Sequence, residues 1–156
     1  MRRKIEKLTQ EVVSYANNKA SWGPGPWWDE PDRVEFRHAG LVCLIVRNTR
    51  LGNLCGYVAV PPEHPLYGCH YENVEVEVHG GLTYSDKCHE HICHVPEPGE
   101  PDDVWWLGFD CAHGDDLVPA IASTFGVLED GSQHYRDLAC VRRQTEWLAD
   151  QLWREK

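Results

Sequence analysis

The sequence predicts an α+β domain, in which an antiparallel or mixed β-sheet is accompanied by an N-terminal and a C-terminal amphipathic helix. Three observations support this class. Apolar residues recur at helical spacing near both ends of the chain. Between positions 33 and 60, segments typical of β-strands alternate with turn residues. At residues 73–79, apolar and polar residues alternate one by one. Because 156 residues suffice to bury a core, we expect one domain over residues 1–156.

Both expected helices follow from apolar spacing. Ile5, Leu8 and Val12 repeat with the helical period, which predicts a helix over residues 3–18. From Tyr135 onward, apolar residues at the same period predict a closing helix of about five turns.

The expected strands lie between these helices. Residues 33–38, 41–46 and 54–60 look like strands separated by turn residues, and the last two segments are apolar runs. Residues 73–79 alternate, with valines on one face and Glu75, Glu77 and His79 on the other, which predicts a half-buried strand. Residues 103–110 are apolar on both faces, as in a central strand.

Two segments are not expected to form regular elements. Residues 21–28 carry Trp22, Trp27 and Trp28 among prolines and glycines. These rings can close the edge of the core, which we favour, or stack on a ligand. Residues 83–101 form a long polar loop, and such loops are usually functional or disordered.

Charge and composition restrict the partners. The formal net charge of −10 makes nucleic acid an unlikely partner, because that affinity rests on neutralising phosphates with Lys and Arg. No apolar run approaches the roughly 20 residues needed to span a membrane. Met1 to Lys4 precede an amphipathic stretch and no apolar signal segment, so we expect a cytoplasmic protein. In that compartment the seven cysteines are thiols or metal ligands and not a disulfide framework.

Candidate chemistry is concentrated between positions 79 and 116. Histidines, cysteines and aspartates cluster here: His79, Cys88, His89, His91, Cys93, His94, Asp110, Cys111, His113, Asp115 and Asp116. We expect His79 and residues 110–113 to meet at neighbouring strand ends, with the loop of residues 88–94 covering the pocket.

Three stretches of this chain resemble a family of small uncharacterised proteins from bacteriophages and prophages. They are HGGLTYS (residues 79–85), WWLGFDCAHGD (residues 105–115) and CGYV (residues 55–58). The resemblance covers most of the chain and implies a setting without a mechanism: a phage accessory protein acting in the host bacterial cytoplasm.

The first hypothesis is a zinc-dependent hydrolase. Imidazole and thiolate are ligands that zinc prefers, and three protein ligands plus water make a catalytic site. The candidate ligands are His79, Cys88, His91, Cys93, Cys111 and His113. With Asp110 or Asp115 completing the set, bound water would attack an electrophile, and Glu77 or Asp116 would serve as base.

The second hypothesis is a cysteine-dependent enzyme. Cys111 would be the nucleophile with His79 or His113 as its base. Gly80 and Gly81 would offer backbone donors to an oxyanion. The adjacent Asp110 opposes this chemistry, because a neighbouring negative charge raises the pKa of a thiol.

The third hypothesis has no catalysis: a phage factor that binds a small-molecule ligand or a host protein. Five tryptophans offer flat surfaces for such a partner: Trp22, Trp27, Trp28, Trp105 and Trp106. For Trp105 and Trp106 we favour a place on the two sides of a central strand. For Asp116 we favour a role as the cap of a helix over residues 117–123.

Overall fold

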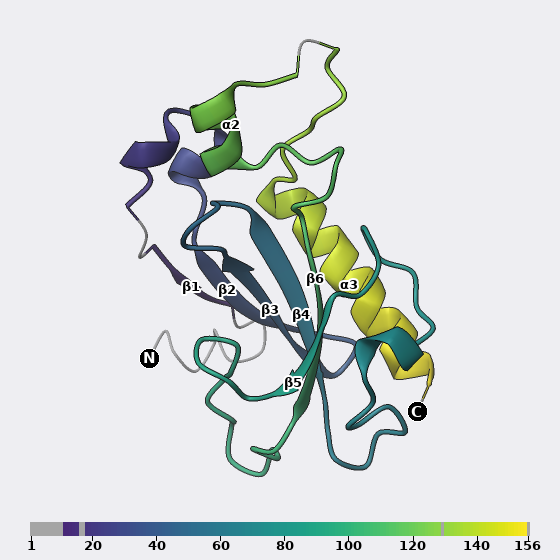
Figure 1. Cartoon of the computed structure of the whole chain (residues 1–156). Helices are drawn as coiled ribbons and strands as arrows, with labels where there is room; N and C mark the ends of the chain where they lie inside the picture. The colour runs from purple at the N-terminus through teal and green to yellow at the C-terminus, as the bar shows by residue number, and fades with distance from the viewer. Residues whose placement is uncertain (1–10, 16–17, 129, 156) are drawn as a thin grey trace.

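The computed structural model describes residues 11–15, 18–128 and 130–155. They form a six-stranded sheet of order β1-β2-β3-β4-β6-β5, with every neighbouring pair antiparallel (Figure 1). The strands are β1 (Val12–Ser14), β2 (Arg33–His38), β3 (Leu41–Arg47), β4 (Leu54–Val60), β5 (Tyr84–Lys87) and β6 (Trp105–Asp110). The α+β class and the antiparallel sheet are confirmed.

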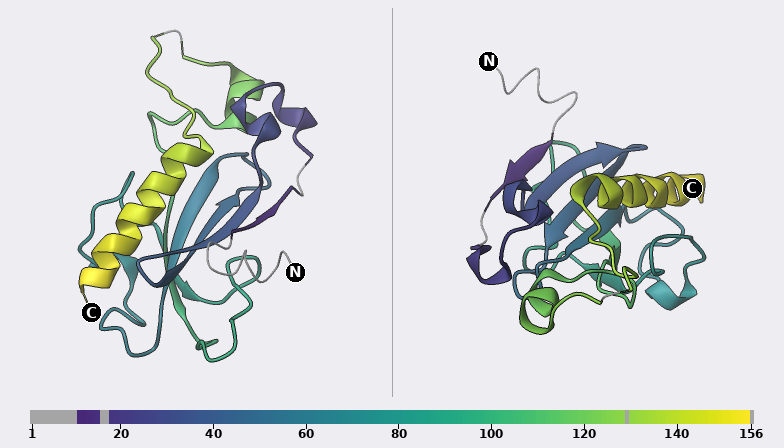
Figure 2. Two further views of the ribbon diagram at one scale, coloured as in Figure 1. Left: turned by 180° about the vertical axis from the view of Figure 1, so that it is seen from behind. Right: turned by 90° about the horizontal axis from the view of Figure 1, so that it is seen from above.

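The predicted C-terminal helix is also confirmed. Helix α3 (Leu138–Arg154) crosses one face of the sheet (Figure 2), and the Asp137 side chain caps it by accepting from the Cys140 amide at 2.8 Å. Helix α2 (Pro119–Phe125) and the short 3₁₀ helices η1 (Ala20–Trp22), η2 (Pro26–Asp29) and η3 (Tyr71–Asn73) complete the elements. None of the helices formed by the described residues is long and apolar enough to cross a membrane.

The expectation of a helix over residues 3–18 is wrong where the structure describes that segment. Val12–Ser14 form β1, the edge strand, and pair with β2. The β-branched pair Val12-Val13 suits a strand better than a helix. Residues 3–10, 16 and 17 lie outside the described residues.

The sheet has an apolar cluster on each face. On β3, Cys43 and Ile45 pack toward α3, whereas Val42 and Leu44 belong to the cluster on the opposite face. Among the described residues, that opposite face is covered by chain segments and not by a helix, and it includes Trp106 (Figure 2). Strands buried on both sides carry no polar alternation, which is why residues 41–46 read as one apolar run.

Residues 73–79 do not form the predicted strand. Val74 and Val78 are buried in the α3-side cluster, so the alternation identified the inward face correctly. The backbone pairs with a helix instead of a strand: the Gln151 side chain bonds both the N–H and the C=O of Glu77, at 2.8 and 2.7 Å. The Gln151 side chain of α3 thus makes the backbone hydrogen bonds that a neighbouring strand would otherwise make.

The region of residues 83–101 is more ordered than expected. Its first part is β5, which pairs with β6. Cys88 and Cys93 then form a disulfide, contrary to the expectation of free thiols. A tight turn explains this pairing, because His89 and Ile92 exchange backbone hydrogen bonds and bring the two cysteine Cα atoms to 4.7 Å.

A buried polar network fixes the tryptophan segment to the start of α3. The guanidinium of Arg47 is fully buried and bonds Asp32 Oδ1 at 2.8 Å, the Tyr135 hydroxyl at 2.8 Å and the Gly52 carbonyl at 2.9 Å. Glu30 in turn accepts from Tyr135 at 2.6 Å. We call this set the Arg47 network.

The tryptophans of residues 21–28 divide as follows. Trp22 and Trp27 are each 6% exposed and close the edge of the core, whereas Trp28 is 52% exposed. The core-closing role is therefore the right one for two of the three rings.

Candidate acid–base site

Three segments meet beside the C-terminal end of β6. The first is the turn after Val78, closed by a hydrogen bond from the Gly81 amide to the Val78 carbonyl at 2.8 Å. The second is the turn of residues 110–116, and the third is the extended lead into α3, which pairs with the second through Asp116 and His134. The predicted meeting of His79 with residues 110–113 is confirmed, since the His79 and His113 ring centroids lie 5.7 Å apart.

His79 and Asp116 form a close pair. His79 Nε2 lies 2.9 Å from Oδ1 and 3.0 Å from Oδ2 of Asp116, whose side chain is fully buried. Because a carboxylate can only accept, this contact assigns a proton to Nε2. In neutral His79, Nδ1 is then the basic nitrogen, and it has no hydrogen-bond partner among the described residues.

The Asp116 carboxylate is held ionised. Burial alone would raise its pKa, but hydrogen bonds from His79, Arg136 and the His113 amide outweigh burial and lower the pKa below the usual value. Arg136 Nε donates to Oδ1 at 2.7 Å and the His113 amide to Oδ2 at 2.9 Å. A buried ionised carboxylate with three donors is suited to orienting an imidazole.

His79, Asp115 and Asp116 are also the described residues that could hold a metal, with ligand atoms within 4.8 Å of one another. Arg136 already bonds both carboxylates, Asp116 at 2.7 Å and Asp115 at 3.0 Å. A metal ion placed among them would have to displace a guanidinium of the same charge sign. This arrangement favours a histidine hydrogen-bonded to a carboxylate over a metal centre.

A second imidazole–carboxylate pair lies next to the first. His113 Nε2 is 3.2 Å from Asp110 Oδ1 but does not have hydrogen-bond geometry, and it is buried without a hydrogen-bond partner among the described residues. Asp110 Oδ2 accepts from the Thr83 hydroxyl at 3.2 Å. The His113 ring lies against the backbone of Gly80, where an added Cβ would come within 2.1 Å of Nε2. Gly80 also has a φ of +68°. A glycine is required here both for the turn and for the ring.

The sulfur part of the predicted cluster is not at this site. Cys111 follows β6 but is 3% exposed and packs in the α3-side core. Burial, followed by the charge of Asp116, raises the pKa of its thiol well above the usual value. Cys111 is therefore a buried core residue, which corrects its assignment as a nucleophile or a metal ligand.

The loop of residues 88–94 is likewise remote, so it does not cover the site. It starts after Lys87, which pairs with Trp105, whereas Asp110 is at the other end of β6, roughly 17 Å away at the rise of a strand. The rest of the loop lies at β2, where Arg33 bonds the His91 and Cys93 carbonyls, and β3 and β4 separate β2 from β6. Cys88 and Cys93 are bonded to each other and provide no thiolate, and His91 is exposed on the loop. These three residues are not metal ligands together with His79.

Three smaller expectations also change. The Glu77 side chain is exposed and has no described contact with the site, so it is not placed to be the base. The Gly81 amide donates to Val78 and cannot serve an oxyanion. Helix α2 is capped at Val118 without a side-chain bond, so Asp116 is not its cap.

Sequence reasoning missed the Asp116–His79 pairing and Arg136. Asp116 follows a histidine in a turn, a pattern that a cap also shows. Arg136 is one of the basic residues of the stretch 136–143, with no local signal that sets it apart. Arg136 reaches the carboxylates of Asp115 and Asp116 only because residues 116 and 134 pair.

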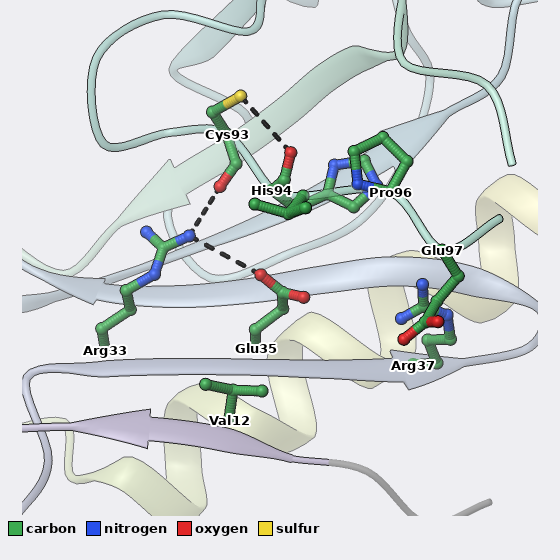
Figure 3. Close-up of a pocket in the computed structure, with 9 residues that line it drawn as sticks. Val12, Arg33, Glu35, Arg37, Cys93, His94, Pro96 and Glu97 are labelled. Atoms are coloured by element: carbon green, nitrogen blue, oxygen red, sulfur yellow. Dashed lines mark hydrogen bonds and ion pairs between the residues drawn. The ribbon is translucent and has the colours of Figure 1, made fainter. Parts of the chain in front are cut away.

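A hollow of about 550 Å³ lies away from the acid–base site, between β2 and the chain that follows the disulfide (Figure 3). Arg33 bonds the Cys93 carbonyl at 2.6 Å and lies 3.7 Å from Glu35, while Arg37 pairs with Glu100. Both guanidinium groups are thus engaged in holding the loop against the strand. His94 also lines this hollow, and its buried Nε2 has no hydrogen-bond partner in the described part of the chain.

Comparison with known proteins gave no relative from which a role could be transferred. The chain matches no protein-family model, and neither a curated protein nor a solved structure matches it significantly.

Proposed function

We propose that this protein is a hydrolase in which His79, oriented by Asp116, is the general base and His113 the general acid. The observation that carries the proposal is the His79–Asp116 contact, in which a buried ionised carboxylate fixes the proton on Nε2 and leaves Nδ1 basic. An accessory role for a phage or prophage in the host cytoplasm, expected from the family resemblance, is part of the proposal.

The chemistry follows from the two pairs. Nδ1 of His79 would take a proton from water as the water oxygen bonds to a carbonyl or phosphoryl centre. Protonated His113, ion-paired with Asp110, would give its proton to the leaving group as the scissile bond breaks. Two imidazoles 5.7 Å apart, one against a buried carboxylate and one against a half-buried carboxylate, suit this division of roles.

The test is a hydrolysis assay with 4-nitrophenyl compounds of four classes: a phosphodiester, a phosphomonoester, a carboxylic ester and an anilide. His79→Gln should lower the rate roughly 10²- to 10⁴-fold, the usual contribution of a general base. His91→Gln, at an exposed histidine on the disulfide loop, is the matched control and should leave the rate unchanged. Absence of turnover in all four classes, or equal rates in both variants, would overturn the proposal.

The zinc hypothesis stays a prediction and now concerns only His79, Asp115 and Asp116. Because Arg136 competes for both carboxylates, we expect protein treated with a chelator to keep its activity. Elemental analysis of untagged protein provides the measurement. One zinc per chain, lost together with activity in His79→Gln, would favour the metal-dependent mechanism.

A second candidate function is a non-catalytic binding module. The hollow beside β2 favours it, because about 550 Å³ is within the range of small-molecule sites, and its His94 Nε2 lacks a partner among the described residues. Mass spectrometry of protein from a native extract separates the two functions. A retained small molecule that is lost in His94→Phe but kept in His79→Gln would favour the binding module.

A further inference from the structure

Besides Asp116, which holds the ring, Gln144 of α3 holds the backbone of His79. The His79 amide donates to Gln144 Oε1 at 2.9 Å, and the two residues are 65 positions apart in the chain. In the described part of the chain this is the one hydrogen bond of the His79 backbone, because the His79 carbonyl has no partner there. His79 is therefore held at two points, its backbone by Gln144 and its ring by Asp116.

The chain on either side of His79 gives its backbone little other support. The residues immediately before it form no strand, so no neighbouring strand fixes their position. Gly80 and Gly81 follow it with φ of +68° and +78°, and glycine is the residue with the greatest backbone freedom. The contact with α3 is thus the main constraint on where the His79 backbone lies.

Helix α3 is a firm support for this contact. Gln144 lies between Val141 and Leu148, both fully buried in the cluster between α3 and the sheet. A packed helix provides a fixed point from which a side chain can hold another segment. This precision matters at a reacting group, because a misplacement of about 1 Å can cost roughly 10²-fold in rate.

A second glutamine of α3 makes the same kind of contact two residues earlier. Gln151 bonds the N–H and the C=O of Glu77, whose side chain has no described contact with the acid–base site. Gln144 and Gln151 are seven positions apart, about two helical turns, so both lie on the same side of α3. Only Gln144 holds the residue that carries the proposed base. Gln151 is therefore a matched control for a purely structural role.

We propose that Gln144 is a positioning residue for His79: by fixing the His79 backbone to α3, it keeps the imidazole where Nε2 meets Asp116. The inference deepens the proposed function, and only its effect on the rate rests on that function. Without the bond to Gln144, the backbone of His79 shifts and the contact between Nε2 and Asp116 weakens. Fewer neutral rings then carry the proton on Nε2 and leave Nδ1 basic.

The first readout needs no substrate. In Gln144→Met, which keeps the side-chain length but loses the strong acceptor, ¹⁵N NMR should show a smaller excess of the Nε2–H form in neutral His79. Gln151→Met should leave the His79 signals as in wild type. Gln144→Glu keeps an oxygen acceptor at the same side-chain length and should restore them. Equal changes in the two methionine variants, or no change in Gln144→Met, would overturn the inference.

The second readout is the rate of hydrolysis per folded protein. Gln144→Met should lower kcat by up to roughly 10²-fold, the effect of a slightly misplaced reacting group, and should leave KM unchanged. Gln144→Glu should recover most of the loss, and Gln151→Met should keep the wild-type kcat. A higher KM at constant kcat in Gln144→Met would contradict the positioning role, because it would assign Gln144 to substrate binding.

The outcome is separable from that of the proposed function. A change of the His79 ring signals in Gln144→Met but not in Gln151→Met, without hydrolysis by the wild type, would leave the positioning role standing and remove the enzyme. Hydrolysis that depends on His79 but has the same rate in Gln144→Met would do the reverse.

Discussion

The Arg47 network and the acid–base site are both partly buried clusters of charge that include carboxylates and arginine, yet they differ in how their atoms are used. In the Arg47 network, all three guanidinium nitrogens have protein partners. At the acid–base site, His79 Nδ1 and His113 Nε2 have no hydrogen-bond partner in the described chain.

This difference distinguishes a polar cluster that is satisfied by its own members from the cluster on which the proposed function rests. A cluster whose members satisfy one another fixes the fold, because removing one member leaves the rest buried and unpaired. A cluster with unused donors and acceptors is costly unless something else binds there. We therefore expect changes in the first cluster to affect stability and changes in the second to affect activity.

The largest expected effect on stability is that of Arg47→Met. It leaves the Asp32 and Glu30 carboxylates without their cation and should lower the free energy of unfolding by about 3–5 kcal/mol, measured by urea denaturation. Arg50→Met, at an exposed arginine three positions on, should change it by less than about 0.5 kcal/mol. Similar losses of unfolding free energy in the two variants would mean that the Arg47 network has no structural role.

Asp116→Asn should act on both stability and activity. Losing the charge that accepts from His79 and Arg136 should cost about 2–3 kcal/mol of unfolding free energy, and activity should fall with it. Asp115→Asn, at a largely exposed carboxylate, should cost less than about 1 kcal/mol.

The loss of unfolding free energy in Asp116→Asn should depend on pH. The pKa of Asp116 is lowered in the folded protein, so its ionised form stabilises the fold fully above the unfolded-state value of about 3.9. That contribution disappears as the pH falls through the folded-state pKa, so wild type and Asp116→Asn should converge in acid. A stability difference that stays constant across this range would contradict the ionised, hydrogen-bonded carboxylate.

The double change Cys88→Ser and Cys93→Ser tests whether the disulfide loop is independent of the acid–base site at Asp110. Opening so short a loop should cost about 2 kcal/mol by loop-closure entropy. Hydrolysis should be unchanged, because Cys88 is at the far end of β6 from Asp110 and Cys93 lies at β2, two strands away from β6. A loss of activity beyond the loss of folded protein would place the loop back at the site.

The smallest expected difference compares Gly80→Ala with Gly81→Ala. Both positions have positive φ, +68° and +78°, so both variants carry the same backbone penalty. Only the methyl group at position 80 meets a side chain, that of His113. Gly80→Ala should therefore be less stable by about 1 kcal/mol or more and should lose activity. Equal behaviour of the two would mean that the His113 position is unimportant.

Much of the sheet could be predicted from the sequence, and the failures have physical causes. The segments predicted as strands at residues 33–38 and 54–60 form strands with those bounds. The alternation of residues 73–79 reports which face is buried but not what the backbone pairs with, and here the partner is a glutamine side chain of α3. The strand β5 was missed because its YSDK sequence at the sheet edge is mostly polar.

The site was only partly predictable. His79 does meet residues 110–113, but not as a strand end: residues 77 and 79 bond glutamine side chains of α3, which brings His79 beside the end of β6. Which ligand types converge does not follow, because the topology sends the Cys88 loop to the other end of β6 and turns Cys111 into the core. Arg136 is distant in the chain and lies at the site only through the pairing of residues 116 and 134.

The account depends most on the tautomer of His79, which ¹⁵N NMR of the imidazole ring measures without a substrate. In neutral His79 the proton should be on Nε2, with Nδ1 unprotonated, and Asp116→Asn should weaken this preference. A proton on Nδ1 of wild-type His79, with Nε2 bare, would mean that Asp116 does not orient the ring and that the proposed base does not exist.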